Sequence, residues 1–241
     1  MAVQSLPGAP DMTVTLVTGA NKGLGYETTR RLIEQGHTVY IGARSIERGE
    51  AAAAELGARF VQIDVTDDTS VETAMRVIEE REGRLDVLVN NAGIGSVGID
   101  GLTGASALAV FNTNAVGVVR VTQAALPLLR QSENPVVVNI SSGLGSFWAV
   151  TNPERHESHN PFLVYGATKA AVSMLTVQYA KELPDIKFNA VEPGFTATDL
   201  TAAFGGGRPV QESAEVIVRM ATIGKDGPTG TFQENAGELA W

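Results

Sequence analysis

Short runs of apolar, mostly β-branched residues alternate along this chain with longer stretches of helical character. Such runs are typical of strands buried on both faces of a parallel sheet, and the intervening helices supply the crossovers between them. The expected strands are Val14–Thr18, Thr38–Gly42, Phe60–Asp64, Leu85–Asn90, Val136–Ser141 and Phe188–Glu192. The alternation predicts one doubly wound α/β domain of about seven strands flanked by helices, with ligands at the carboxyl ends of the strands.

The helical stretches carry their own start and stop signals. From Val71 to Ile78 apolar residues recur at the spacing of an amphipathic helix, whose start Asp67 or Ser70 would cap. A long helix is expected over residues 103–130, with Pro127 near its end or at a kink. Further helices are expected over residues 165–182 and 211–222.

Composition limits the partners of this chain. Its 241 residues suffice for a full core, and 18 basic against 27 acidic residues give a net charge of −9, which argues against nucleic acid or an anionic membrane as partner. The absence of cysteine excludes thiol chemistry. Residues 1–12 lack the pattern of a secretory signal and are expected to form a loose tail before a domain over residues 13–241. A soluble cytoplasmic protein is therefore expected.

A glycine-rich turn follows the first strand. Its glycines would let backbone amides approach a pyrophosphate at the start of the next helix. The alternative is a tight strand–helix turn that binds nothing. The residues expected to contact a dinucleotide here are Gly19, Asn21, Lys22, Gly23, Leu24 and Gly25.

Two cations predict which dinucleotide is bound. Arg44 directly follows the second strand, at the place where an acidic residue would favour NAD and an arginine accommodates the 2′-phosphate of NADP. Lys22 in the glycine turn would converge on the same phosphate. The alternative is two solvated surface cations. We expect NADP rather than NAD.

Polar or small residues end the other strands. Asp64 and Val65 follow the third, and the Asp64 carboxylate would either accept the adenine amino group or cap the next turn. The fourth strand ends in residues suited to a backbone that lies against a cofactor, namely Asn91, Ala92 and Gly93. Ser142 after the fifth strand could donate to a substrate carbonyl.

Tyr165 and Lys169 stand four positions apart in a segment that starts a helix. This spacing places a phenol and an ammonium on one helical face, about 5–6 Å apart between Cβ atoms. A nearby cation lowers the pKa of a phenol and makes it an acid or base for a carbonyl or alcohol group. The alternative is an inward-packed aromatic residue beside a solvated lysine.

These segments, in this order, resemble the short-chain dehydrogenase/reductase family, from Thr13 to about Thr198. The matching motifs are Thr18-Gly19-x-x-x-Gly23-x-Gly25, Asp64-Val65, Asn90-Asn91-Ala92-Gly93, the helix residue Asn114, Ser141-Ser142, Tyr165-x-x-x-Lys169 and Pro193-Gly194-x-x-x-Thr198. Asn-Lys-Gly in the turn and Ala-Arg-Ser after the second strand are similar to the NADPH-dependent carbonyl reductases. The resemblance implies a Rossmann-type fold, NADPH as cofactor, and reversible reduction of a ketone or aldehyde to an alcohol.

The resemblance also implies a role for each matching residue. Tyr165 would be the general acid in reduction and the base in oxidation, and Lys169 would lower its pKa and hold the nicotinamide ribose. Ser142 would polarise the carbonyl, and Asn114 would anchor a water relay from Lys169 to solvent. The residues that would wrap the nicotinamide and phosphates are Pro193, Gly194, Thr196 and Thr198.

Three variable segments would shape the substrate pocket. The stretch between Ser142 and Tyr165 is about twice as long as in most family members, which marks residues 143–161 as an insertion. A glycine-rich lid is expected at about residues 195–210, and residues 94–102 complete the pocket. The helices over 103–130 and 165–182 commonly pair between subunits in this family, so a dimer or tetramer is expected.

Rival functions have weaker support. A hydrolase would need a nucleophile elbow, and the chain has no Gly-x-Ser-x-Gly motif. His156, Glu157 and His159 could form a metal site, although loop histidines are usually solvated. The remaining alternative is an NADPH-binding regulatory protein on the same fold. Such proteins typically lack the catalytic tyrosine or lysine, and both are present here.

Overall fold

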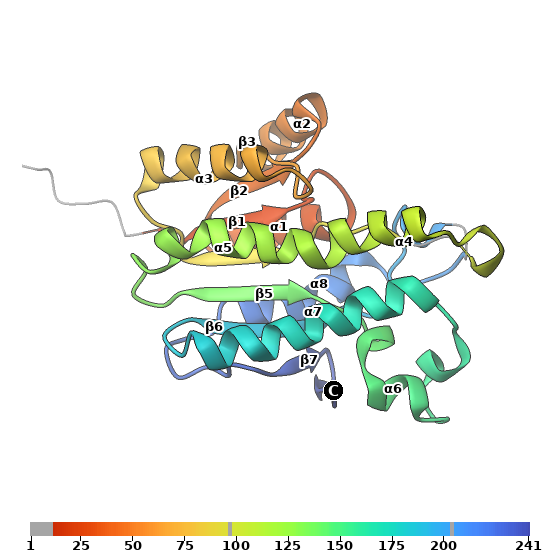
Figure 1. Cartoon of the computed structure of the whole chain (residues 1–241). Helices are drawn as coiled ribbons and strands as arrows, with labels where there is room; N and C mark the ends of the chain where they lie inside the picture. The colour runs from red at the N-terminus through yellow and green to blue at the C-terminus, as the bar shows by residue number, and fades with distance from the viewer. Residues whose placement is uncertain (1–11, 96–97, 203–204) are drawn as a thin grey trace, which may run out of the picture.

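Eight strands form one sheet in the computed structural model, which describes residues 12–95, 98–202 and 205–241 (Figure 1). Their order is β3-β2-β1-β4-β5-β6-β7-β8, and neighbours are parallel except for β7 and β8. The strands are β1 Val14–Thr18, β2 Thr38–Ala43, β3 Arg59–Gln62, β4 Val87–Asn90, β5 Val136–Ile140, β6 Lys187–Glu192, β7 Phe232–Glu234 and β8 Gly237–Glu238. The doubly wound α/β class is confirmed, with one strand more than expected because β8 folds back on β7.

Helices cover both faces of this sheet. The helices α3, α5 and α7 pack on one face, and α1, α2 and α8 pack on the other (Figure 1). Their bounds are α1 Gly23–Glu34, α2 Ile46–Leu56, α3 Asp68–Glu82, α4 Gly104–Phe111, α5 Gly117–Leu129, α6 Phe147–Thr151, α7 Leu163–Glu182 and α8 Val210–Ala221, with short turns η1 Ile99–Gly101, η2 Asn112–Val116, η3 Gly143–Gly145 and η4 His156–His159. Among the described residues, none of these helices is long and apolar enough to cross a membrane.

Alternating side chains of each strand supply the two cores. Leu16 and Val17 on β1 are both fully buried, yet they belong to clusters on opposite faces of the sheet. Val137 and Val138 on β5 divide in the same way. Burying one such side chain contributes about 1.5–3 kcal/mol, which is why both faces of these short runs are apolar.

Two strand boundaries differ from the sequence expectation by two residues, and the other differences are of one residue. The strand β3 ends at Gln62 rather than Asp64, because the Asp64 carboxylate accepts hydrogen bonds from the Thr66 amide at 2.9 Å and hydroxyl at 2.7 Å and turns the chain. The strand β4 begins at Val87 rather than Leu85, whose amide donates to Leu128 on the neighbouring helix instead.

The expected helix over residues 103–130 is a continuous helical run with a defect in its middle. It consists of α4, the wider π-turn η2 and α5, and Pro127 lies in its last turn. Asp67 caps α3 by accepting from the Ser70 amide at 2.6 Å. The helix α7 begins at Leu163, so Tyr165 lies in its first turn. Of the expected tail, residues 1–11 lie outside the described residues.

Candidate active site

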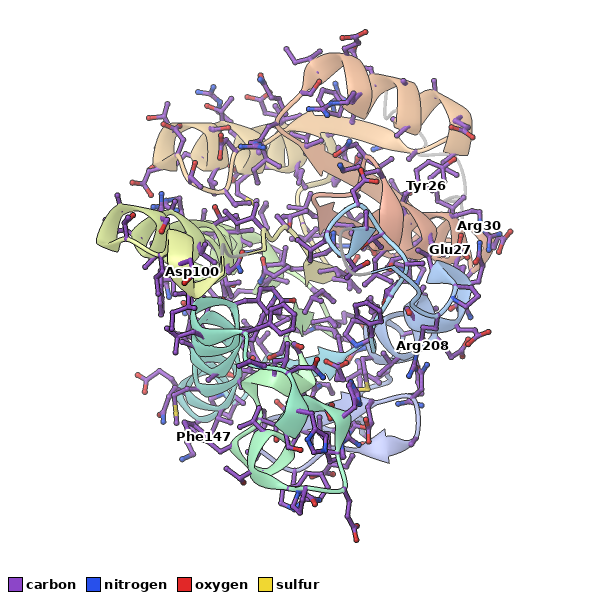
Figure 2. The ribbon with its side chains drawn as sticks, turned by 90° about the vertical axis from the view of Figure 1, so that its right-hand side faces the viewer. Tyr26, Glu27, Arg30, Asp100, Phe147 and Arg208 are labelled. Atoms are coloured by element: carbon purple, nitrogen blue, oxygen red, sulfur yellow. The ribbon has the colours of Figure 1, made fainter. Side chains whose placement is uncertain are left out.

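One cavity of about 1200 Å³ lies at the carboxyl ends of the strands. It gathers side chains and backbone from the turns after β1 to β6, as expected for a doubly wound sheet. Figure 2 looks onto this edge, where Asp100, Phe147 and Arg208 mark the segments that follow β4, β5 and β6. The residues expected at the cofactor all line the cavity: Gly19, Asn21, Lys22, Gly23, Leu24, Gly25, Arg44, Asp64, Val65, Asn91, Ala92, Gly93, Tyr165, Lys169, Pro193, Gly194, Thr196 and Thr198.

The glycine turn after β1 has the form of an anion cradle. Gly19 has φ +66°, and a Cβ there would come within 2.9 Å of the Ala92 backbone. The helix α1 begins directly afterwards at Gly23, with no side chain capping its first amides and no acidic residue in its first turn. Since no described residue of this first turn is acidic, its amides and the helix dipole are available to an anion, which fits a bound pyrophosphate.

The ends of β1 and β4 are locked together below this turn. The Thr18 hydroxyl accepts from the amides of Asn91 and Ala92, each at 3.0 Å. The Asn91 side-chain amide donates to the Thr18 carbonyl at 2.8 Å. A Cβ at Gly25 would meet the same amide nitrogen at 2.5 Å, so α1 approaches the end of β4 this closely only because residue 25 is glycine.

Arg44 and Lys22 both line the cavity, but their surroundings differ. Arg44 is exposed and acts on Asp64 by charge. Burial alone would raise the pKa of Asp64, yet the two Thr66 hydrogen bonds and the charges of Arg44 and Arg120 hold it below its usual value. Asp64 thus caps its turn while it faces the cavity. Lys22 instead forms an exposed ion pair with Asp199, Nζ to Oδ2 2.6 Å.

Asn114 does not line the cavity but holds one of its walls. It lies in the π-turn η2 and is 2% exposed. Its Oδ1 accepts from the Ile94 amide at 2.8 Å, while its Nδ2 donates to the Ile94 carbonyl at 2.9 Å and to the Thr168 hydroxyl at 3.1 Å. Asn114 therefore fixes the loop after β4 to α7, a contact that the sequence did not indicate.

Ser142, Tyr165 and Lys169 lie together at the other end of the cavity. The Lys169 ammonium is 5.5 Å from the centre of the Tyr165 ring and donates to the Ile140 carbonyl at 2.7 Å. Burial lowers the pKa of Lys169 to about 8, against the opposing effect of Glu192. The i, i+4 spacing thus brings the phenol and the ammonium to the same site.

The expected lowering of the Tyr165 pKa is wrong for this structure. Burial and the negative charge of Glu192 raise the pKa of Tyr165, and only the hydrogen bond with Ser142 acts to lower it. The Lys169 ammonium donates to the Ile140 carbonyl, and burial together with Glu192 sets the direction of the Tyr165 pKa.

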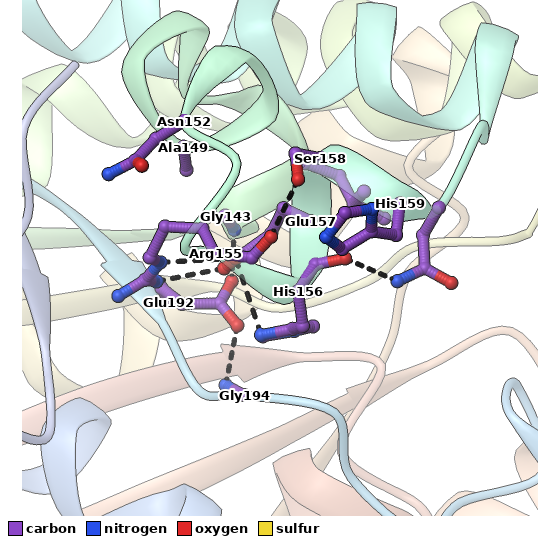
Figure 3. Close-up of polar contacts among 12 residues, drawn as sticks. Gly143, Ala149, Asn152, Arg155, His156, Glu157, Ser158, His159, Glu192 and Gly194 are labelled. Atoms are coloured by element: carbon purple, nitrogen blue, oxygen red, sulfur yellow. Dashed lines mark hydrogen bonds and ion pairs between the residues drawn. The ribbon is translucent and has the colours of Figure 1, made fainter.

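Glu192 and the 143–161 segment add residues to the site that sequence reasoning missed. Glu192 ends β6, lines the cavity and accepts hydrogen bonds from the amides of Gly143 and Gly194 (Figure 3). Glu157 of η4 is also buried and forms an ion pair with Arg155 at 2.8 Å. The sequence did contain a signal for Glu192, because it is an acidic residue at the end of a buried strand, directly before Pro193.

The two histidines of this segment do not converge. His156 Nδ1 lies 3.3 Å from a Glu157 oxygen, whereas His159 Nε2 lies 3.2 Å from the Pro153 carbonyl oxygen. Within residues 12–95, 98–202 and 205–241, no three histidine or acidic side chains are grouped to hold a metal ion.

In the expected lid region, Thr196 contacts Arg208 and Ser213. Arg208 pairs with Thr196 as an isolated bridge, and a Cβ at Gly194 would meet the Arg208 guanidinium at 2.5 Å. The Thr196 hydroxyl donates to the Gly194 carbonyl and is also hydrogen-bonded to the Ser213 hydroxyl. The Thr196 side chain is therefore engaged with other protein groups.

Comparisons with known proteins agree with this geometry. The profile of the short chain dehydrogenase family matches residues 13–207. Short-chain dehydrogenase anuI of Penicillium roqueforti is 36% identical over an alignment of 228 residues, with 88% of this chain and 89% of the relative covered. The (−)-isopiperitenone reductase of Mentha piperita is 31% identical, with 90% of this chain and 94% of the relative covered.

A solved structure extends the likeness to three dimensions. The NADPH-bound carbonyl reductase from chicken fatty liver superposes with a TM-score of 0.84 at 26% identity, covering 95% of this chain and 99% of that one. The ordered motifs, the doubly wound sheet and the family match together show that this chain belongs to the short-chain dehydrogenase family, a family of oxidoreductases.

Proposed function

We propose that this chain is an NADPH-dependent reductase that converts a ketone or aldehyde to an alcohol, reversibly, with Tyr165 as the general acid. One observation carries the proposal: Ser142, Tyr165 and Lys169 line the same cavity as the glycine turn and Arg44. The uncapped start of α1 would hold the pyrophosphate and Arg44 the 2′-phosphate. NADPH, when bound, supplies the hydride that adds to the carbonyl carbon.

The protein residues would handle the oxygen and its proton. Ser142 would donate to the carbonyl oxygen, and Tyr165 would transfer its proton to that oxygen as negative charge develops there. Lys169 would compensate the phenolate left behind, because its ammonium lies 5.5 Å from the ring. Asn114 would fix the position of Ile94, which lines the cavity, through hydrogen bonds to its amide and carbonyl groups.

The substrate end of the cavity favours a largely apolar carbonyl compound. Large apolar side chains that line it from the segments after β4, β5 and β6 are Ile94, Leu144, Phe162, Phe195 and Leu200, beside the polar His156 and Asn160. Ile94, Phe195 and Leu200 are more than a third exposed, which is unusual for large apolar residues unless they face a ligand or partner. A screen of carbonyl compounds, followed by NADPH absorbance, should therefore begin with apolar ketones and aldehydes.

The test of the catalytic assignment is Tyr165→Phe, which keeps the ring and removes the proton. We expect NADPH to bind with unchanged affinity while turnover falls by about a hundredfold or more. Tyr179→Phe on the same helix is the matched control, because its hydroxyl bonds to Gln123 away from the cavity, and it should keep wild-type rates. Near wild-type turnover by the Tyr165 variant would contradict the proposal.

NADPH consumption also separates the proposal from the regulatory alternative. A sensor on this fold would bind NADPH without oxidising it in the presence of any carbonyl compound. The half-buried Tyr165 and the buried Lys169 favour an enzyme, because a binding protein gains nothing from burying an ammonium whose pKa falls to about 8.

A further inference from the structure

One buried carboxylate joins the two loops that flank the proposed reaction. Glu192 is 7% exposed at the end of β6. Its Oε2 accepts from the amide of Gly143, the residue after Ser142, and its Oε1 accepts from the amide of Gly194 at 2.8 Å (Figure 3). Each oxygen therefore fixes a different backbone segment, one beside the serine and one in the turn after β6.

Each segment is also in contact with another part of the protein on the side away from Glu192. The carboxylate between the two segments therefore sets the distance between them. A Cβ at Gly143 would come within 2.2 Å of a Glu157 oxygen, which shows that the insertion presses on this loop. The turn at Gly194, with φ +82°, is covered by the Arg208 guanidinium. The loops are thus enclosed between the insertion and the lid, with Glu192 between them.

We propose that Glu192 is a positioning residue that aligns Ser142 with the turn at Gly194, and that the alignment is complete only while its carboxylate is ionised. The reason is that a carboxylate is a stronger acceptor than the neutral acid, so both amide bonds weaken on protonation. The inference rests on the proposed function, because it gives Glu192 a part in the same reaction.

The surroundings place this ionisation in the neutral range. Burial raises the pKa of Glu192 to about 7, Glu157 and Glu234 raise it by repulsion, and the two amides act to lower it. Four kinds of charged or titratable group surround it: Tyr165 and Lys169 on α7, Glu157 with its partners Arg155 and His156 at η4, Glu234 on β7, and Arg208 over Gly194.

The first experiment requires no substrate. In the full-length protein, the amide proton resonances of Gly143 and Gly194 should shift with pH with a midpoint near 7, the pKa to which burial raises Glu192. Glu192→Gln, which keeps the shape and removes the charge, should abolish both titrations. Glu238→Gln, an exposed carboxylate on β8, is the control and should leave them unchanged. Amide signals that do not titrate in the wild type would overturn the proposal.

The second experiment uses a carbonyl substrate found by the screen. Glu192→Gln should lower kcat by about 10- to 100-fold with KM changed less than about threefold, because a misplacement of about 1 Å costs up to ~100-fold in rate. The rise of wild-type kcat through pH 7 should disappear. An unchanged kcat, or equal losses in kcat and KM with the pH profile intact, would mean a structural role only and would overturn the proposal.

Stability serves as the check on folding. A glutamate whose pKa rises from 4.5 to about 7 on folding stabilises the fold below pH 4.5, and this contribution is lost as pH rises through 7. Between pH 5 and 8, the unfolding constant of Glu192→Gln should therefore fall relative to wild type by on the order of 100-fold. Amide titrations without any turnover by the wild type would refute the proposed function while leaving the Glu192 contacts established.

Discussion

We expect the choice between NADPH and NADH to depend most directly on Arg44. It lines the cavity, and no carboxylate of the described residues forms an ion pair with its guanidinium, whereas Lys22 is already engaged with Asp199 at 2.6 Å. A charge-assisted bond to a 2′-phosphate is worth about 1.5–3 kcal/mol, and the planar guanidinium can form two such bonds. Lys22 must first exchange Asp199 for the phosphate, so its net contribution is smaller.

We therefore expect wild-type protein to prefer NADPH over NADH by about a hundredfold or more in kcat/KM. Arg44→Asp should reverse the preference, since the carboxylate repels phosphate and accepts from a free ribose hydroxyl. Lys22→Ala should only weaken it. Arg48→Asp on α2 makes the same charge change outside the cavity lining and serves as control. Comparable wild-type efficiencies with both cofactors in steady-state kinetics would show that neither cation reaches the phosphate.

At the scale of elements, the turn η3 and the helix α7 set the distance between Ser142 and Tyr165. The turn packs so closely that a Cβ at Gly145 would lie 2.5 Å from the Lys169 carbonyl carbon and 2.7 Å from the Ala170 nitrogen. Both atoms belong to the helix backbone and cannot rotate away. The loop that carries Ser142 is therefore held against α7 by backbone contact, in addition to the bond between its Gly143 amide and the Glu192 carboxylate.

Gly145→Ala should push η3 off α7 and cost about 1–3 kcal/mol of unfolding free energy, measured by denaturant titration. Turnover should fall further than stability suggests, because the displacement moves Ser142 relative to Tyr165. Gly104→Ala, at a helical glycine with nothing within 4 Å, is the matched control and should be neutral or slightly stabilising. Equal stability of the two variants would show that η3 is free to shift.

At the scale of the whole molecule, we propose that this chain forms a dimer or tetramer through α4–α5 and α7. Four large apolar side chains on this helical run and on α7 are exposed, namely Leu108 at 72%, Val116 at 45%, Leu163 at 65% and Met174 at 59%. An exposed apolar surface of this kind is a common mark of a protein interface. Association would also restrict the movement of η2, which carries Asn114, and of α7, which carries Tyr165 and Lys169.

Light scattering at micromolar concentration should therefore give two or four times the chain mass of 25.3 kDa. Leu108→Lys together with Met174→Lys should shift the distribution towards monomer, because a desolvated charge opposes apolar contact. Lys181→Glu, on the polar side of α7, is a control for a change of charge alone. A monomer mass for the wild type would refute this proposal.

The sequence by itself determined the sheet, the order of its strands along the chain and the glycine turn, because these depend on local patterns. Apolar runs, glycine spacing and the four-residue step from Tyr165 to Lys169 are each read within a few neighbouring residues. The end of β3, which differs from the expected boundary, is also explained by a local contact, the hydrogen bond from Thr66 to Asp64.

Only the tertiary structure decided the electrostatics and the packing of the site. Glu192 meets Gly143 across 49 positions of sequence, and Asn114 meets Ile94 across 20. The raised pKa of Tyr165 depends on burial and on that distant carboxylate, so the spacing to Lys169 alone gave the wrong direction. The pKa of a group depends on its burial and on the charges of all the residues packed around it. The fold determines which residues these are, so they cannot be found from the adjacent sequence.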